Sequence, residues 1–317
     1  MARKRAVARA IARAILPDFA FERLLAIRSR GFHFRPAPAI AAAAAASVTS
    51  SKTPAFSLSM MPWTFFPDLP FEEQLAKVAK AGYTNVELVG EYRDWSAKDF
   101  ARANAARKRH GILIDAVAGL DHGVANPDTR DAFLAELTQA LVPMETLGCA
   151  AMIVLSGNAI PGLARDVQHQ SCIETLKQAA ASIDGKQIDG QPVRLLLESI
   201  DPEENPECFL TTAEEAIAVV RAVNHPQVQI LYDLYHEQIA EGNLIVKLEK
   251  HIDAIGLIHV ADVPGRHEPG TGEINYNNIY RKLVELNYHG IVAMEFKPTG
   301  DPVLALRAAK AVALSQV

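Results

Sequence analysis

The chain has 317 residues, of which 49% are hydrophobic and 22% are charged. This composition is typical of a globular protein with enough apolar residues for a core. It excludes a wholly disordered chain, a collagen-like repeat and a small disulfide-rich scaffold. The three cysteines, Cys149, Cys172 and Cys208, include no CxxC pair, so neither a disulfide framework nor a thiolate zinc site is indicated.

The net charge of −5 hides an uneven distribution along the chain. Residues 1–53 contain ten of the 32 basic and two of the 37 acidic residues, a balance of +8, so residues 54–317 carry −13. Affinity for nucleic acid comes largely from neutralising phosphates, and an acidic body therefore argues against a nucleic-acid partner. No apolar run approaches the roughly 18 residues of a membrane-spanning helix. We expect a basic leader over 1–53 and a globular domain over 54–317.

The leader differs in composition from the rest of the chain. Its first 16 residues are basic and Ala-rich, an alanine tract follows at 39–46, and a Ser/Thr stretch at 47–53. One interpretation is an export signal, because Arg28, Arg30 and Phe32 before the alanine tract resemble a twin-arginine signal. The arginines are not adjacent and the basic region is long, which favours a disordered leader or a mis-started N-terminus. We expect a cytoplasmic protein, with export as the alternative.

From residue 55 onward, short apolar runs alternate with longer amphipathic segments. The apolar runs predict strands, as expected of parallel strands covered on both faces, over 56–60, 85–88, 112–117, 151–155, 194–197, 228–232, 254–259 and 290–294. The amphipathic segments predict helices over 71–80, 97–110, 131–147, 167–182, 213–223, 244–250, 276–287 and 302–314. Eight strand–helix units in about 260 residues predict an α/β fold of the (β/α)₈ TIM barrel type. A doubly wound sheet is less suitable, because its Gly-rich first turn is missing.

Acidic and histidine side chains lie where predicted strands end. Strands five to eight end in Glu198, Asp233, His259 and Glu295, and strand two ends in Glu87. Strand ends of a barrel meet at one face, so these side chains should converge. Neighbouring carboxylates repel each other unless a cation lies among them, and oxygen ligands with one imidazole suit Mg²⁺ or Mn²⁺, with Co²⁺ as a further choice. Taken singly, each acid has the simpler interpretation of a helix cap or salt-bridge partner. Four on consecutive strands favour one divalent metal ion.

Further candidates follow the strand ends. His236 lies three residues after Asp233, Arg266 lies in the Gly/Pro-rich loop 263–276, and Lys297 lies two residues after Glu295. We predict that these residues, with Glu87, bind substrate oxygens, since the cations suit a carboxylate. The alternative for the loop is a solvated connector. The loop after predicted strand three, 119–128, matches no substrate motif.

At these residues the sequence resembles the hydroxypyruvate isomerase family, within the xylose-isomerase-like sugar isomerase/epimerase superfamily. The similarity covers nearly all of 55–314. Its most specific stretches are ADVPGRHEPGTGEINY (261–276), LLLESIDPEENPECFLTT (195–212), YDLYHEQIAEGNL (232–244) and MEFKP (294–298). The resemblance implies a metal held by Glu198, Asp233, His259 and Glu295. It also implies that Glu198 and Glu295 are the catalytic acid and base.

The implied reaction is proton transfer next to a carbonyl, through an enediolate that a metal stabilises as a Lewis acid. A small hydroxy-carbonyl compound is the expected substrate, and hydroxypyruvate to tartronate semialdehyde the expected conversion. His259 stands where hydroxypyruvate isomerases can have glutamine and sugar epimerases have histidine, so a ketose 3-epimerase is the alternative. A barrel that binds a metal or sugar without turnover is the third hypothesis. An endonuclease IV type of enzyme requires a His-rich multi-zinc site, and the acidic body argues against it. Barrels of this family often associate, so a homo-oligomer is also expected.

Overall fold

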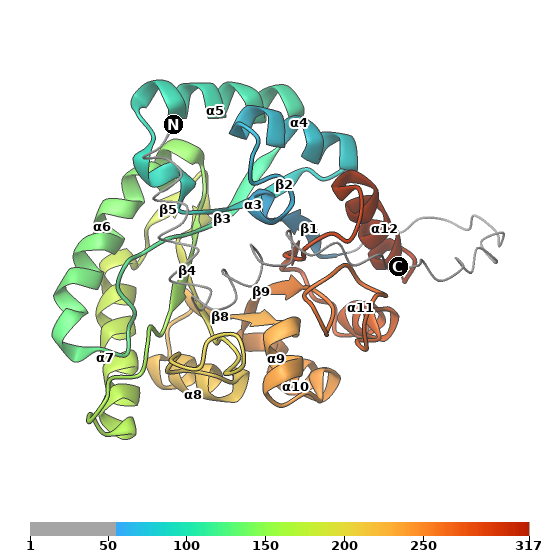
Figure 1. Ribbon diagram of the computed structural model, residues 1–317. Helices are drawn as coiled ribbons and strands as arrows, with labels where there is room; N and C mark the ends of the chain where they lie inside the picture. Colours follow the sequence, from blue (N-terminus) through green and yellow to red (C-terminus); the bar gives the residue numbers. More distant parts are fainter. Residues whose placement is uncertain (1–54, 317) are drawn as a thin grey trace, which may run out of the picture.

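The structure is a computed structural model and describes residues 55–316. The predicted leader lies outside the described residues. Eight parallel strands form one sheet in the order β1-β10-β9-β8-β7-β4-β3-β2. The end strands β1 and β2 lie next to each other, which nearly closes the sheet into a barrel (Figure 1). The predicted TIM barrel is confirmed.

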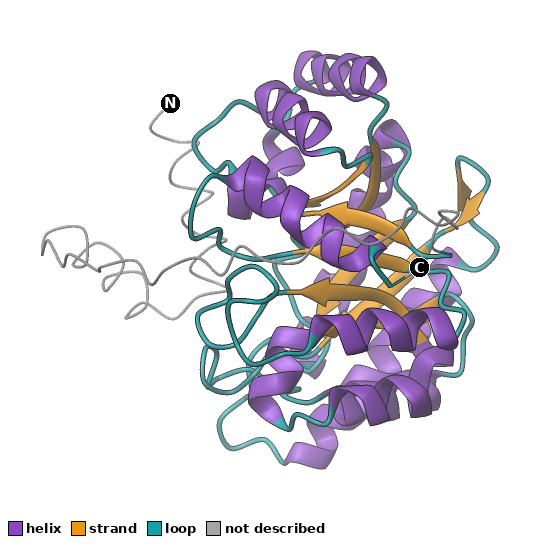
Figure 2. Ribbon diagram, turned by 90° about the vertical axis from the view of Figure 1, so that its right-hand side faces the viewer, coloured by secondary structure: helices purple, strands orange, loops and turns teal. Residues whose placement is uncertain are grey.

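The strands lie close to their predicted positions: β1 (Ser57–Met60), β2 (Asn85–Val89), β3 (Leu113–Ala118), β4 (Ala151–Leu155), β7 (Arg194–Glu198), β8 (Val228–Asp233), β9 (Ile255–Val260) and β10 (Ile291–Met294). The predicted helices are α4 (Phe71–Ala81), α5 (Ala97–His110), α6 (Arg130–Leu147), α7 (Arg165–Ile183), α8 (Ala213–Val223), α10 (Leu244–His251), α11 (Tyr276–Glu285) and α12 (Pro302–Leu314). Figure 2 shows these helices outside the strands. No helix among residues 55–316 is both long and apolar enough to cross a bilayer.

Several elements were not predicted. Short helices α3 (Pro62–Phe65) and α9 (Leu234–Ala240) follow β1 and β8 directly, and 3-10 turns η1 (Glu91–Asp94), η2 (Pro127–Thr129) and η3 (Ile252–Ala254) lie in connections. A small hairpin joins β5 (Gln187–Ile188) to β6 (Gln191–Pro192). Its turn, Asp189-Gly190, has positive φ at both residues, and this dipeptide is a recognised hairpin signal.

The core has two layers. One lies between the strands and the surrounding helices, and the other fills the barrel interior. Strand side chains alternate between these layers, so a residue two positions after an interior residue also points inward. Four interior residues stand two positions before the predicted site residues of strands five to eight: Leu196, Leu231, Leu257 and Ala293. The same alternation that builds the interior core therefore directs the polar residues into the mouth of the barrel.

Candidate active site

The structure brings the four predicted metal ligands together. One ligand atom from each of Glu198, Asp233, His259 and Glu295 lies within 4.8 Å of the others, and all four residues are buried. Strand register contributes to this convergence, because Asp233 on β8 is directly paired with His259 on β9. Glu198 ends β7, and Glu295 follows β10 by one residue. The four donors therefore come from consecutive strands of the barrel.

The imidazole of His259 lies between two sets of carboxylates. Its Nδ1 is 2.9 Å from Glu295 Oε2 and 3.9 Å from both Glu198 Oε1 and Asp233 Oδ2. Its Nε2 lies 2.9 Å from Glu87 Oε2. Because a carboxylate accepts, Nε2–H donates to Glu87 and Nδ1 faces the cluster. Burial lowers the pKa of His259, but the neighbouring carboxylates Glu295 and Glu87 outweigh burial and raise it well above the ordinary value.

Arg266 supplies a second positive charge at the cluster. Its Nη2 lies 2.7 Å from Glu295 Oε2 and 3.5 Å from Asp233 Oδ2, and its Nη1 lies 3.1 Å from Glu204 Oε2. The guanidinium is buried and stacks over Tyr235, 5.1 Å from the ring centre. Arg266 therefore binds the carboxylates of the cluster directly, in addition to any contact with a substrate.

The two predicted acid/base residues have opposite pKa shifts. Burial raises the pKa of Glu198 to about 7, although the nearby His259 opposes the shift. Burial also acts on Glu295, but Arg266 and His259 outweigh it and hold the pKa of this carboxyl below its usual range. The two carboxylates of one cluster therefore differ in proton affinity, a pattern found in carboxylate pairs that divide the acid and base roles.

The donor set fits one divalent cation. Three carboxylates and one imidazole match the oxygen-rich, mixed ligation of Mg²⁺ or Mn²⁺. Although His259 Nδ1 is buried, it has no hydrogen-bond partner of good geometry among residues 55–316. Its other nitrogen bonds to a carboxylate, an arrangement common for histidines that bind metals. The observation that favours a metal here is therefore a buried imidazole nitrogen directed at three carboxylates, so that four donor atoms face one point.

His236 is fixed by acids on both sides. Its Nδ1 lies 2.6 Å from Asp201 Oδ2, and its Nε2 lies 3.5 Å from Asp233 Oδ2. Asp233 also caps α9, since its Oδ1 accepts from the backbone N–H groups of Tyr235 and His236. One oxygen of Asp233 thus orders the helix that carries His236, and the other faces the cluster.

A cavity of about 200 Å³ opens above the cluster. Four of the predicted site residues line it: Glu198, Glu295, His236 and Arg266. We call it the site cavity. The rest of its lining is largely apolar and includes Met61, Trp63 and Leu155. The site cavity therefore combines charged groups with an apolar lining.

Two predicted substrate-binding residues lie elsewhere. Glu87 is fully buried in the middle of β2, against the far side of His259, and does not line the site cavity formed by the described residues. Lys297 is half-buried, and burial lowers its pKa. Its backbone N–H donates to the Arg266 carbonyl at 2.6 Å, but Lys297 is not among the described residues that line the site cavity.

Sequence reasoning missed several polar residues near the site. Asp201 and Glu204 follow β7 and bind His236 and Arg266, respectively. Together with His236 they form a second group whose possible ligand atoms lie within 4.8 Å of one another. Asp201 is already paired with His236, and Glu204 with Arg266. Their position just after a strand-end acid was the available signal. Arg93 and Asp121, from the loops after β2 and β3, also line the site cavity, and no sequence signal marked them.

Comparisons with known proteins agree with this geometry. Residues 75–313 match the family model described as "Xylose isomerase-like TIM barrel". The 2-oxo-tetronate isomerase of Pectobacterium atrosepticum is 30% identical over 251 residues, covering 78% of this chain and 92% of that protein. The hydroxypyruvate isomerase of Escherichia coli is 29% identical over 256 residues, covering 79% and 95%. The solved structure described as an AP endonuclease, family 2, from Brucella melitensis has a TM-score of 0.73 and 28% identity, covering 80% of this chain and 98% of that one.

These matches extend over most of the described residues. They confirm the predicted relationship to hydroxypyruvate isomerases, because relatives with that name align over nearly their whole length. The chain therefore belongs to the xylose isomerase-like TIM barrel family, and its curated relatives place it among the isomerases.

Proposed function

We propose that the protein is a metal-dependent isomerase that moves a proton between adjacent carbons of a short hydroxy-carbonyl acid, most directly converting hydroxypyruvate to tartronate semialdehyde. The observation that carries the proposal is the convergence of three buried carboxylates and one imidazole nitrogen within 4.8 Å at the mouth of the barrel. The relatives named hydroxypyruvate isomerase and 2-oxo-tetronate isomerase support an oxo acid as the substrate.

Glu198, Asp233, His259 and Glu295 would hold one divalent ion, Mg²⁺, Mn²⁺ or Co²⁺. When bound, such an ion supplies Lewis-acid stabilisation of the negative charge that develops on the substrate oxygens. Glu87 holds the His259 ring through Nε2, so that Nδ1 stays directed at the cluster. The remaining chemistry belongs to the side chains of this chain.

Glu198 and Glu295 are the proposed acid and base. Glu198 lies at the end of β7 and Glu295 just after β10, and β8 and β9 lie between these two strands in the barrel. Both side chains line the site cavity. A substrate lying between them presents adjacent carbons to different carboxylates. One glutamate removes the proton next to the carbonyl and the other delivers a proton to the neighbouring carbon, which interconverts the hydroxyl and carbonyl positions.

Further residues are proposed to hold the substrate or to tune the carboxylates during this transfer. His236 is fixed by Asp201 and lines the cavity, where its Nε2 can contact a substrate hydroxyl. Arg266 keeps Glu295 ionised, because its buried guanidinium lies 2.7 Å from that carboxylate. We keep Lys297 as a proposed rim cation.

The test is product analysis by NMR. Metal-loaded protein is incubated with hydroxypyruvate and separately with fructose and tagatose. The proposal expects tartronate semialdehyde from hydroxypyruvate and no epimer from the sugars. Epimer formation from a ketohexose alone would transfer the function to the 3-epimerase alternative. No product from any of them would contradict both.

The remaining expectations stay predictions. These are the cytoplasmic location, the homo-oligomer, the absence of a nucleic-acid partner and the boundary between leader and domain at residue 53. The size-exclusion profile and the N-terminal mass of the native protein test the oligomer and the leader, respectively.

A further inference from the structure

The charged side chains that line the site cavity differ in how fully ion pairs with other residues of the protein already occupy them. Six charged or titratable residues of the described chain line it: Arg93, Asp121, Glu198, His236, Arg266 and Glu295. Two of them are carboxylates of the cluster, and a substrate carboxylate near these would be repelled. An acidic substrate therefore needs a cation that is free to bind it.

Arg266 is poorly suited to this role because its donors are already used. Its guanidinium binds Glu295, Asp233 and Glu204, all within 3.5 Å, and is buried. His236 is held between Asp201 and Asp233. Among the described residues that line the site cavity, Arg93 is the arginine outside this network.

Arg93 stands on a rigid support at the functional face of the barrel. It belongs to η1, directly after the C-terminal end of β2, where barrels of this type place their chemistry. The Gly90 N–H donates to the Ala118 carbonyl at 3.0 Å, which ties η1 to the end of β3. A Cβ at Gly119 would lie 2.9 Å from Gly90 Cα and 3.4 Å from Arg93 Cδ, so glycine lets these two loops touch. The Arg93 side chain therefore lies against the backbone that borders the site cavity.

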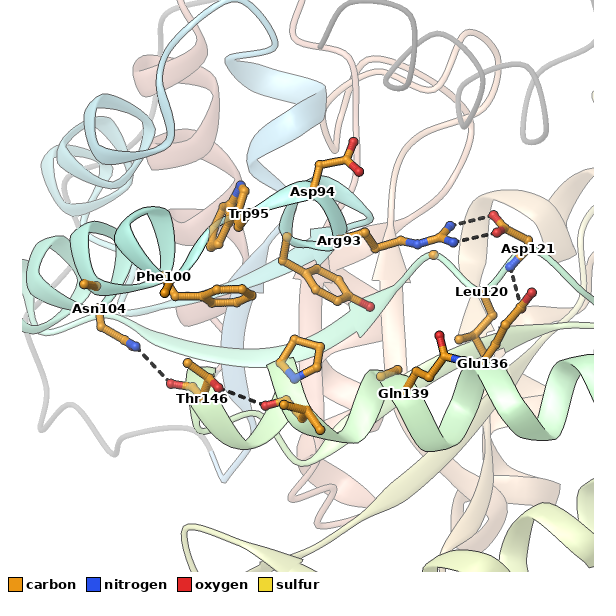
Figure 3. A pocket seen from close by; sticks show the side chains of 17 residues that line it. Arg93, Asp94, Trp95, Phe100, Asn104, Leu120, Asp121, Glu136, Gln139 and Thr146 are labelled. Carbon is orange, nitrogen blue, oxygen red and sulfur yellow. Dashed lines mark hydrogen bonds and ion pairs between the residues drawn. The ribbon is translucent and has the colours of Figure 1, made fainter. Parts of the chain in front are cut away.

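The present partner of Arg93 is an exposed carboxylate. Nη1 and Nη2 of Arg93 each lie 2.5 Å from one oxygen of Asp121, the two parallel contacts drawn in Figure 3. The Asp121 side chain is 59% exposed and that of Arg93 33%. Asp121 is positioned by its backbone N–H, which donates to Glu136 at 2.9 Å. Because the Asp121 carboxylate is mostly exposed, water can solvate it when it leaves, and a substrate carboxylate can offer the guanidinium the same two parallel hydrogen bonds in its place.

The ion pair also separates two cavities. Arg93, Gly119, Leu120 and Asp121 line both the site cavity and a groove of about 950 Å³ that continues between α5 and α6. Figure 3 shows Arg93 and Asp121 at one end of this groove, with Trp95 and Phe100 toward the other. Arg93 and Asp121 therefore both border the space that a substrate in the site cavity would occupy.

We propose that Arg93 is the carboxylate subsite of this enzyme, where the fork of its guanidinium exchanges Asp121 for the carboxylate of the substrate. This inference rests on the proposed function and assigns the residue that recognises the acid group of its substrate. Planar guanidinium groups bind carboxylates through two parallel hydrogen bonds, which fixes the substrate's orientation as well as its charge. Arg93 is then a specificity residue, and Asp121 is a competitor that keeps the guanidinium in place when the cavity holds no acid.

The test measures binding of glycerate to the full-length, Mn²⁺-loaded protein by isothermal titration calorimetry. Glycerate is hydroxypyruvate with its ketone reduced to a hydroxyl. It keeps the carboxylate but has no carbonyl, so it cannot be isomerised. Arg93→Met should raise its Kd by about 10- to 100-fold, the loss expected for a charged, two-pronged hydrogen bond. Asp121→Asn should lower the Kd, because a competing carboxylate is removed. Arg221→Gln, at another exposed ion pair on α8 with Asp253, is the matched control and should leave it unchanged.

Turnover supplies the second readout. Dihydroxyacetone has a hydroxymethyl group in place of the hydroxypyruvate carboxylate, so Arg93→Met should reduce kcat/KM for hydroxypyruvate at least about tenfold more than for dihydroxyacetone. Equal losses for the two substrates, an unchanged glycerate Kd in Arg93→Met, no glycerate binding by the wild type, or weaker binding by Asp121→Asn would each overturn the subsite. A wild type that binds glycerate through Arg93 but isomerises neither compound would support the subsite and refute the proposed function.

Discussion

Glu91 provides a stability prediction that can be worked out in detail. It begins η1 directly after β2, and its two carboxylate oxygens are shielded from solvent without a hydrogen-bond partner among residues 55–316. Burial raises the pKa of Glu91 from 4.5 to about 7. Above that pH the folded protein holds a buried charge that water solvates better in the unfolded chain.

The sign and size of the change in the free energy of unfolding with pH follow from proton linkage. Between pH 4.5 and 7, folded Glu91 binds more protons than unfolded Glu91, so the free energy of unfolding falls as the pH rises. Each unit of pKa difference corresponds to about 1.4 kcal/mol, so the full loss is about 3 kcal/mol and is complete above pH 7. Glu91→Gln removes this ionisation. The variant should therefore gain about 3 kcal/mol relative to the wild type between pH 4.5 and pH 8.

Urea unfolding of both proteins, followed by the fluorescence of Trp63 and Trp95, measures this difference at each pH. Glu73→Gln, at an exposed position of α4, is the control and should show no such gain. The reasoning is refuted if the stability difference between Glu91→Gln and the wild type changes by less than about 0.5 kcal/mol over the range, the size of an ordinary surface effect.

Three further outcomes are expected at the site. Glu198→Gln and Glu295→Gln should each lower turnover by at least about 100-fold, the usual contribution of a general acid or base, with an unchanged circular dichroism spectrum; near-normal turnover would contradict their roles. Removing metal with EDTA should lower Tm, and Mn²⁺ at 100 times its Kd should raise the free energy of unfolding by about 2.7 kcal/mol. Scanning calorimetry measures Tm in both conditions, and the same Tm in EDTA and in Mn²⁺ would contradict the metal site. Asp201→Asn should weaken the 2.6 Å hydrogen bond that fixes His236 and lower kcat about tenfold. The Mn²⁺ affinity measured by titration should stay within about threefold of the wild-type value. A parallel loss of metal affinity would show that Asp201 acts on the metal instead.

Much of the fold and the cluster of strand-end acids could be predicted because both follow from simple periodicities. Strands covered on both faces appear as short apolar runs, and a barrel places all strand ends at one face. The strand-end acids Glu198 and Asp233 therefore had to meet, whatever the details of the loops. His259 lies one residue before the end of β9 and Glu295 one residue after the end of β10. Both still point into the barrel mouth, because the alternation of side chains along each strand sets their direction and the exact strand end does not.

The depth of a side chain inside the barrel could not be predicted in the same way. The β2–β3 pairing shifts register between Val86 and Glu87, and residue counting does not reveal such a shift. Because β2 continues for two residues beyond Glu87, this side chain lies inside the barrel against His259 and does not line the site cavity formed by the described residues, although it was predicted to contact substrate.

Loop residues were the least predictable part of the site. Glu204 contacts Arg266 although the two lie 62 positions apart, and Arg93 contacts Asp121 over 28 positions. These contacts depend on backbone turns such as the close approach of Gly90 and Gly119, which no strand or helix periodicity encodes. The fold and the convergence of the strand-end acids were therefore readable from the sequence, whereas the loop residues that line the site cavity required the structure.

Solvent deuterium exchange tests the central claim most directly. The protein is incubated in D₂O with hydroxypyruvate, with Mn²⁺ or with EDTA, and the substrate is followed by NMR. A metal-dependent enediolate mechanism predicts deuterium at the carbon next to the carbonyl, together with tartronate semialdehyde, only in the Mn²⁺ sample. Equal exchange with and without metal, or conversion without any deuterium in the product pool, would contradict proton transfer by Glu198 and Glu295 at a metal centre.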